Sequence, residues 1–357
     1  MTSAPTRTRG EFHTLTVARV ERLCDDAVAV SFDVPEHLRA SYAFRAGQSL
    51  TLRRVVDGED HRRDYSICAR AGEPPRVGVR LIPGGRFSQW LVEDVRPGDK
   101  MEVQTPRGSF CAEPEGGRHL LIAAGSGITP ILSIAATLMT HPDARVALLC
   151  GNRTSGSVMF ADELADLKDR YGSRFELVHV LSREPRSVEL FSGRLSGDRL
   201  RQLLRVLVPI ASLDHVWLCG PFAMITEVRE VLRDLGIEEA KVHAELFFVE
   251  EPPPSVSRPE PTFTGETSAV TVVLDGRTST HVQSRGETVL DAAQRTRADV
   301  PFACKGGVCG TCRVQLLSGE VDLRRNYALE PDELERGFVL TCQSYPISAE
   351  LSVDFDA

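Results

Sequence analysis

The 357-residue sequence lacks the short motifs of several large enzyme classes. It contains no G-x-S-x-G of serine hydrolases, no H-E-x-x-H of zinc peptidases and no Walker A phosphate loop. It also has no surplus of positive charge, because 42 lysines and arginines stand against 50 aspartates and glutamates and give a net charge of −8. A negative overall field disfavours contact with phosphate backbones, so we expect no nucleic-acid partner.

The sequence has no apolar segment of the kind that export or membrane insertion needs. Residues 1–9, MTSAPTRTR, have no hydrophobic core, so we expect no signal peptide and a cytoplasmic location, where thiols stay reduced. Residues 120–140 are uncharged, but they contain Gly125, Gly127 and Pro130, which suit a tight turn better than a membrane span. We therefore expect no transmembrane segment.

Length and proline content indicate how the chain divides into domains. A chain of this length is expected to hold two or three domains. The prolines between 252 and 261 exclude a helix or a central strand there, so 251–265 is interpreted as a semi-rigid extended linker. The tail beyond it, 266–357, carries 14 acidic and 9 basic side chains and therefore holds most of the net negative charge.

Two kinds of pattern precede the linker. Short alternating segments with Gly and Pro between them predict an antiparallel β-barrel or sandwich over 10–114. From 115 to 250, strand-like and helical segments alternate, which predicts an α/β domain with a parallel sheet. In the tail, strand-like segments at 270–274 and 312–317 and a helical one at 288–296 predict a small α+β domain.

Four of the nine cysteines have a recognisable spacing. Cys304, Cys309 and Cys312 form C-x₄-C-x₂-C, and Cys342 follows far downstream, which is the spacing of plant-type [2Fe–2S] ferredoxins. Glycines between them let backbone N–H groups approach the bridging sulfides. A zinc site is the alternative, but paired C-x₂-C knuckles would then be expected. Four other thiols are interpreted as small packing residues: Cys24, Cys68, Cys111 and Cys150.

The chain resembles ferredoxin–NADP reductases joined to a plant-type ferredoxin domain. The resemblance rests on R-x-Y-S at 63–66, on a G-x-G-x-x-P turn at 125–130, on Cys219-Gly220-Pro221 and on the cysteine spacing. It implies an FAD-binding barrel, an NAD(P)-binding domain and a β-grasp ferredoxin domain, in the order found in oxygenase reductases. A narrower resemblance, to the reductase subunits of phenylacetyl-CoA epoxidases, rests on three segments: 304–312, 326–334 and 353–357.

The family implies that R-x-Y-S binds a flavin. In extended backbone Arg63 and Tyr65 point to the same face, so Arg63 can hold a pyrophosphate while Tyr65 lies against the isoalloxazine. The resemblance places Ser66 near the flavin atom that receives hydride, as a catalytic residue, and favours FAD over FMN. A half-buried strand with a surface arginine is the alternative. A phosphate loop at a helix start supports the flavin and would use three further residues: Gly85, Phe87 and Ser88.

The family also implies a nicotinamide site. The glycines of the G-x-G-x-x-P turn allow close approach of a pyrophosphate, and its proline suits a first helical turn. A purely structural glycine turn and an inert thiol at a strand end are the alternatives. Cys219 and Glu245 are expected to act near the hydride path, with Phe247 covering the flavin face. The other residues expected to bind the coenzyme are Gly125, Gly127, Thr129, Pro130, Gly220 and Pro221.

Ser182-Arg183 indicates which coenzyme is used. This pair matches the one that holds the 2′-phosphate of NADPH in relatives, and Arg153 could assist it. An arginine suits a phosphate because its planar guanidinium donates two parallel hydrogen bonds. The alternative is that both arginines are ordinary surface residues. NADPH is therefore expected in preference to NADH, which remains possible.

Together these features predict an NAD(P)H-dependent oxidoreductase that passes electrons through FAD and a [2Fe–2S] cluster to an oxygenase component. The resemblance implies a di-iron acceptor of the phenylacetyl-CoA epoxidase type, in phenylacetate degradation. The reductase of a steroid or aromatic-ring hydroxylase is an alternative. A non-catalytic electron carrier with a degenerate flavin site is another, although the intact motifs and the four cysteines argue against it.

Overall fold

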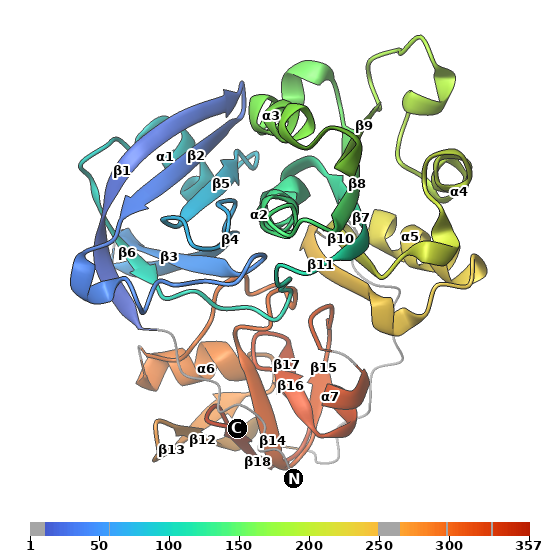
Figure 1. Ribbon diagram of the computed structural model, residues 1–357. Helices are drawn as coiled ribbons and strands as arrows, with labels where there is room; N and C mark the ends of the chain where they lie inside the picture. Colours follow the sequence, from blue (N-terminus) through green and yellow to red (C-terminus); the bar gives the residue numbers. More distant parts are fainter. Residues whose placement is uncertain (1–10, 57, 249–264, 298, 330) are drawn as a thin grey trace. The chain divides into compact units, whose positions relative to one another are not determined.

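The computed structural model describes residues 11–56, 58–248, 265–297, 299–329 and 331–357. They form two compact units, one over 11–248 and one over 265–357 (Figure 1). The predicted linker lies outside the described residues except for Gly265. Within the described part of the chain, no helix is long and apolar enough to cross a membrane.

An antiparallel barrel opens the first unit, as the alternating segments predict. Its strands hydrogen-bond in the order β4-β3-β6-β1-β2-β5, and an isolated bridge between Ile67 and Val77 links the two ends of this order. Alternate side chains point inward, so that Leu15, Leu50 and Val103 are fully buried. The elements are β1 (Phe12–Cys24), β2 (Ala27–Asp33), β3 (Ser49–Val56), β4 (Glu59–Ser66), β5 (Arg76–Arg80), α1 (Arg86–Glu93) and β6 (Lys100–Gln104).

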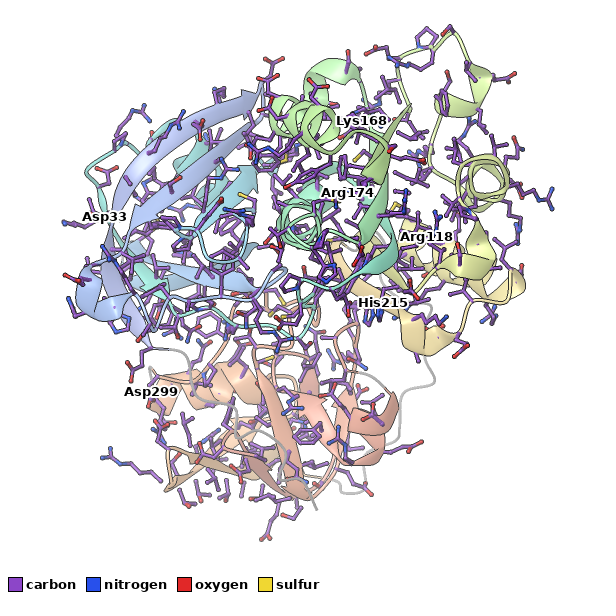
Figure 2. The ribbon with its side chains drawn as sticks, viewed as in Figure 1. Asp33, Arg118, Lys168, Arg174, His215 and Asp299 are labelled. Carbon is purple, nitrogen blue, oxygen red and sulfur yellow. The ribbon has the colours of Figure 1, made fainter. Side chains whose placement is uncertain are left out.

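A parallel sheet follows, as predicted, with strand order β11-β10-β7-β8-β9. Helices α2 and α3 cover one face and α4 and α5 the other (Figure 1). Arg118 and His215 mark the amino ends of β7 and β10 (Figure 2). The elements are β7 (Gly117–Ala124), α2 (Ile128–Leu138), β8 (Ala144–Asn152), α3 (Ala161–Tyr171), β9 (Phe175–Leu181), α4 (Gly197–Leu207), β10 (His215–Pro221), α5 (Phe222–Asp234) and β11 (Val242–Phe248).

Strand order locates the expected ligand site of this sheet. The chain runs outward from β7 to β8 and β9, then returns to place β10 on the other side of β7. In open parallel sheets, ligands bind outside the carboxyl ends of the strands at such a reversal. The turn after β7 lies at this point, and residues 120–140 therefore form a strand end, a turn and α2.

Helix α2 joins the parallel sheet to the barrel. Ten of its eleven side chains are buried. The Ser133 hydroxyl donates to the carbonyl of Ala69 at 2.6 Å, and the Ala71 N–H donates to the Thr137 hydroxyl at 3.1 Å. The apolar cluster around α2 takes side chains from both domains, including Ala29, Ala46, Phe110, Leu148 and Trp217. The barrel and the parallel sheet therefore pack as one unit.

The tail is a mixed α+β domain of the predicted β-grasp kind. Its sheet has the order β13-β12-β18-β14-β16, with β12 and β18 parallel and α6 packed through Leu290 and Ala293 into the same core. The elements are β12 (Thr267–Leu274), β13 (Arg277–Ser284), α6 (Val289–Thr296), β14 (Arg313–Ser318), β15 (Val321–Leu323), α7 (Pro331–Glu335), β16 (Phe338–Leu340), β17 (Ser344–Pro346) and β18 (Glu350–Asp354).

Gly127 fixes the distance between the turn after β7 and strand β10. A Cβ atom at this position would lie 2.2 Å from the carbonyl oxygen of Cys219 and 3.0 Å from the nitrogen of Gly220. Both contacts are backbone, which cannot rotate away. The turn therefore reaches β10 only because residue 127 has no side chain.

We expect Gly127→Ala to destabilise the first unit by about 1–3 kcal/mol, because the added methyl group must push the turn away from β10. Urea unfolding followed by tryptophan fluorescence would measure this change. Gly156→Ala is the matched control, since a Cβ there meets no atom within 4 Å. Equal stabilities of the two variants would contradict the assigned packing.

Candidate functional site

The three predicted catalytic residues lie at the junction of the barrel and the parallel sheet. Ser66 ends β4, Cys219 lies near the carboxyl end of β10, and Glu245 is its register partner on β11. The Ser66 hydroxyl donates to Oε2 of Glu245 at 3.3 Å, across 179 positions of sequence. The fold thus gathers a hydroxyl, a thiol and a carboxyl group from three strands.

Burial keeps these groups uncharged near neutral pH. Removal from water raises the pKa of Glu245 to about 8, the hydrogen bond from Ser66 opposes this, and the charge of Asp64 adds to it. Cys219 is fully buried, and both burial and the neighbouring Glu245 raise the pKa of its thiol. Cys219 is therefore a neutral thiol, and Glu245 has a pKa suited to holding or releasing a proton at physiological pH.

Two adjacent arginines on β4 have opposite environments. Arg62 is buried, its Nη2 lies 2.7 Å from Oδ2 of Asp60, and its guanidinium stacks over the ring of Phe12. Arg63 is exposed, donates to the carbonyl of Arg62 at 2.6 Å, and has no carboxylate partner among the described residues. An unneutralised guanidinium beside Tyr65 is what a flavin diphosphate would require, so Arg63 fits its predicted role.

A row of aromatic rings continues from the R-x-Y-S motif onto α1. The Tyr65 ring lies 6.2 Å from that of Phe87, and Phe87 meets Trp90 edge-on at 5.5 Å. The guanidinium of Arg54 stacks on Trp90 at 4.3 Å. Trp90 and Arg54 were not among the predicted site residues, because nothing in the local sequence connects β3 with α1.

At the start of α1, two local hydrogen bonds hold the Ser88 side chain. The Ser88 hydroxyl is buried, accepts from the N–H of Ile82 at 3.0 Å and donates to the carbonyl of Gly85 at 3.0 Å. It therefore holds the turn, in which Gly84 has a φ of +74°. The N–H groups of the first helical turn have no intrahelical acceptor and are the groups that a phosphate at this end would meet.

The turn after β7 has the geometry that its glycines predict. Gly125 has a φ of +57°, and the buried Thr129 hydroxyl donates to the carbonyl of Ser126 at 2.9 Å. Pro130 lies in the first turn of α2, where its missing N–H costs nothing. The remaining predicted residues lie near the carboxyl end of the sheet: Gly220 and Pro221 at the end of β10, and the partly buried Phe247 on β11.

The residues expected to select the coenzyme lie at the ends of β8 and β9. The N–H of Arg183 donates to the carbonyl of Arg153 at 2.8 Å, and the N–H of Ser182 donates to that of Asn152. Arg183 is exposed, and its guanidinium has no partner among the described residues. Arg153 is different, because its Nη2 lies 2.6 Å from Oδ2 of Asp26. Its guanidinium is therefore already engaged.

The four cysteines of the tail are arranged in two pairs. The thiols of Cys304 and Cys309 share a hydrogen bond, and so do those of Cys312 and Cys342. A two-iron cluster takes two thiolates on each iron. The pairing therefore fits the cluster.

The loop around the first pair stabilises the thiolate of Cys304. Hydrogen bonding with Cys309 lowers the pKa of Cys304 to about 6, although burial opposes it, and backbone N–H groups add to the effect. One of them, from Gly306, donates to the Cys304 sulfur at 3.3 Å. Gly307 has a φ of +79°, and a Cβ there would lie 2.9 Å from the carbonyl oxygen of Arg325. This close backbone approach explains the glycine at position 307.

Three family models match the chain in succession. The oxidoreductase FAD-binding domain matches residues 14–111, the oxidoreductase NAD-binding domain matches 121–230, and the 2Fe-2S iron-sulfur cluster binding domain matches 272–346.

Two relatives match nearly the whole chain. A 1,2-phenylacetyl-CoA epoxidase subunit of Escherichia coli (strain K12) is 45% identical over 353 residues, which span 97% of this chain and 98% of the relative. The chain belongs to the family of oxygenase reductases. The ferredoxin reductase component of 3-ketosteroid-9-alpha-monooxygenase from Rhodococcus rhodochrous is 33% identical over 351 residues, or 96% of each chain. Among solved structures, phthalate dioxygenase reductase matches 96% of this oxygenase reductase and 98% of its own chain, with a TM-score of 0.61 and 27% identity.

As an oxygenase reductase, the chain is an NAD(P)H-dependent oxidoreductase with FAD and a [2Fe–2S] cluster, and its partner is an oxygenase component. The residues described above fit these groups: a free arginine beside an aromatic row, a glycine turn at the strand reversal and two pairs of thiols. The alternative of a non-catalytic carrier is not supported.

A hydrogen-bonded network beside Glu245 was not predicted. Nη2 of Arg107 donates to the Thr51 hydroxyl at 2.5 Å and to Oδ1 of Asp64 at 3.0 Å, and Thr51 donates to the same carboxylate. Asp64 is the variable residue of R-x-Y-S, so the motif itself gives no signal for it. The network holds a negative charge near Glu245 and contributes to its raised pKa.

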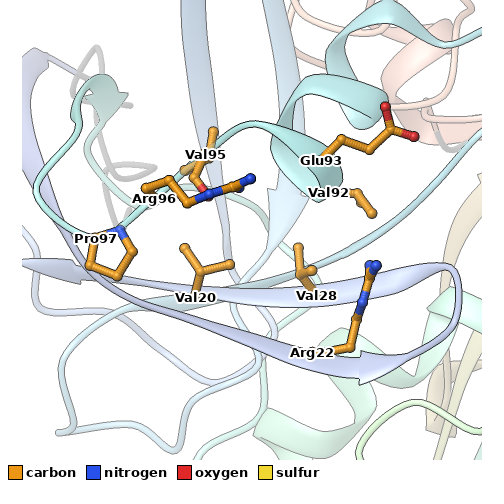
Figure 3. Close-up of a pocket in the computed structure, with 8 residues that line it drawn as sticks. All are labelled: Val20, Arg22, Val28, Val92, Glu93, Val95, Arg96 and Pro97. Carbon is orange, nitrogen blue, oxygen red and sulfur yellow. The ribbon is translucent and has the colours of Figure 1, made fainter.

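A cavity of about 480 Å³ lies on the barrel between β1, β2 and the end of α1 (Figure 3). None of the predicted site residues lines it. It has an apolar floor and a charged rim, and its lining comprises Val20, Arg22, Val28, Val92, Glu93, Val95, Arg96 and Pro97.

We expect the melting temperature of Glu245→Gln, relative to the parent, to rise with pH between about 5 and 8 and then to stay constant. The pKa of Glu245 is about 8 when folded, against an ordinary value of 4.5. The folded state therefore binds more protons across this interval, and the parent loses stability by up to about 1.4 kcal/mol per pH unit.

Thermal unfolding of flavin-free protein from pH 5 to pH 9 would measure this difference. Glu36→Gln, at an exposed site, is the control and should melt in parallel with the parent. A pH-independent difference for Glu245→Gln would show that the carboxyl group is not buried as described.

Proposed function

We propose that this oxygenase reductase takes hydride from NADPH and supplies electrons to a di-iron oxygenase of the phenylacetyl-CoA epoxidase type, in the cytoplasm. The observation that carries the proposal is the 45% identity to a phenylacetyl-CoA epoxidase subunit over nearly all of both chains. The steroid-oxygenase relatives match over a similar length but at 33% or less.

We assign a domain to each cofactor: FAD to 10–114, the coenzyme to 115–250 and the cluster to 266–357. FAD, when bound, supplies the chemistry that converts a two-electron hydride into single electrons. Arg63 would bind the flavin diphosphate, with Tyr65 and Phe87 forming the aromatic wall beside the ring.

Three residues at the junction of the barrel and the parallel sheet would exclude water and hold or release a proton: Ser66, Cys219 and Glu245. Ser66 donates to Glu245 and fixes the position of its carboxyl group. Glu245, with a pKa of about 8, would hold or release a proton at its carboxyl oxygens. Cys219 would present a neutral, fully buried sulfur to the nicotinamide. The absence of fixed negative charge on these three groups near pH 7 favours the approach of a hydride donor.

The coenzyme assignment rests on the ends of β8 and β9. Arg183 is exposed and unneutralised, next to Ser182, and is suited to bind a phosphate through two parallel hydrogen bonds. A 2′-phosphate is present in NADPH and absent from NADH. This difference supports NADPH as the preferred donor.

Electron delivery to candidate oxygenases tests the acceptor. The reductase, loaded with FAD and cluster, should support product formation by a di-iron phenylacetyl-CoA epoxidase component and not by a 3-ketosteroid monooxygenase or an aromatic-ring dioxygenase. Cys309→Ser should stop product formation but retain NADPH oxidation by a dye, whereas Cys111→Ser should retain both. Product with the steroid oxygenase alone would overturn the proposed acceptor.

For the coenzyme, we expect Arg183→Ala to lower kcat/KM for NADPH about tenfold or more and to change that for NADH less than about threefold. Steady-state dye reduction with each coenzyme measures both values. Arg205→Ala, an exposed arginine on α4, is the control. Equal losses with the two coenzymes would remove the 2′-phosphate assignment.

A further inference from the structure

One carboxylate of the barrel reaches the coenzyme edge of the parallel sheet. Asp26 lies in the two-residue turn between β1 and β2, and its carbonyl accepts the N–H of Leu81 at 2.8 Å. Its carboxylate lies between two arginines. Oδ2 is 2.6 Å from Nη2 of Arg153, and Oδ1 is 3.2 Å from Nε of Arg80.

Both arginines lie at the carboxyl edge of the parallel sheet, although Arg80 itself ends the barrel strand β5. Nη1 of Arg80 lies 3.5 Å from where a Cβ of Gly125 would be, so its guanidinium lies against the turn after β7. Arg153 directly follows β8, and its carbonyl accepts the N–H of Arg183. Asp26 therefore lies at the carboxyl ends of β7 and β8, where the phosphates of a coenzyme bind in sheets of this kind.

Asp26 is an ionised group in this position. Burial alone would raise its pKa, but the hydrogen bond from the Cys24 thiol and the charges of Arg80 and Arg153 hold the pKa below its ordinary value. The side chains of Arg153 and Asp26 are 50% and 28% exposed, so an incoming anion can reach the pair. A phosphate there would face one arginine that is free, Arg183, and one that is already neutralised.

We propose that Asp26 is a specificity-determining residue that competes with the 2′-phosphate of the coenzyme for Arg153. A phosphate must displace the carboxylate from Arg153 or bind beside its negative charge, and either lowers the affinity for the phosphorylated coenzyme. Asp26 thus makes the preference for NADPH over NADH smaller than Arg153 and Arg183 alone would give. The proposal rests on the assignment of Arg153 and Arg183 to the 2′-phosphate.

Binding of adenosine 2′,5′-bisphosphate, compared with adenosine 5′-monophosphate, tests this directly without turnover. By calorimetry, Asp26→Asn should bind the bisphosphate about threefold to tenfold more tightly than the parent, as expected for loss of a part-exposed ion pair. Its affinity for the monophosphate should change less. Asp33→Asn, an exposed carboxylate at the end of β2 (Figure 2), is the matched control and should alter neither.

A double-mutant cycle tests whether Asp26 changes bisphosphate binding through Arg153. In an Arg153→Ala background the gain from Asp26→Asn should vanish, because there is no guanidinium to release. Asp26→Ser provides a second variant if the asparagine variant does not fold. Weaker or unchanged binding of the bisphosphate by either variant would overturn the proposal.

The outcomes also separate this proposal from the coenzyme assignment on which it rests. If Arg183→Ala does not selectively weaken the bisphosphate, the 2′-phosphate site itself is wrong. If Arg183→Ala does so but Asp26→Asn brings no gain, the coenzyme assignment stands and the competition by Asp26 is refuted.

Discussion

The flavin and coenzyme residues belong to two different sheets, and one shared apolar cluster holds those sheets together. Side chains of the barrel, such as Ala29 and Phe110, pack in the same cluster as α2 and Trp217. The Ser66–Glu245 hydrogen bond forms at the edge of this contact. Close-packed interiors tolerate little displacement, so the cluster fixes the separation of the predicted flavin and coenzyme residues.

Electrostatics at the junction follow from the same packing. Glu245 loses water where β11 meets Ser66 of the barrel, and Asp64, held by Arg107 and Thr51, adds a negative charge nearby. Asp26 reaches Arg153 because the β1–β2 turn lies over the ends of β7 and β8. In both cases a barrel carboxylate acts on a group of the coenzyme domain. The interface thus positions charges as well as surfaces.

Much of the fold and of the candidate site could be predicted from sequence. The remainder depends on tertiary contacts, which the order of residues in the chain does not show. The turn at Gly125 and Gly127 and the spacing of the four cysteines are local patterns whose chemistry is set by neighbours in the chain. The difference between Arg62 and Arg63 is only partly of this kind, because alternation along β4 puts Asp60 and Arg62 on one face but does not indicate which face is buried. The ion pair between Asp26 and Arg153 is not a local pattern either, because the two residues are 127 positions apart in the chain. Ser88 illustrates a further limit, since the sequence does not indicate that its hydroxyl accepts the N–H of Ile82, six positions upstream.

Helix α2 has a consequence for how the chain folds as it is made. Nearly every side chain of this helix is buried, so alone it would expose an apolar surface on all sides. The barrel that covers one face, and supplies the carbonyl of Ala69 and the N–H of Ala71 to it, precedes α2 in the sequence. During synthesis the covering surface therefore leaves the ribosome before the helix that needs it. A circular permutant that begins at β7 would reverse this order and leave α2 unprotected until the barrel had been translated.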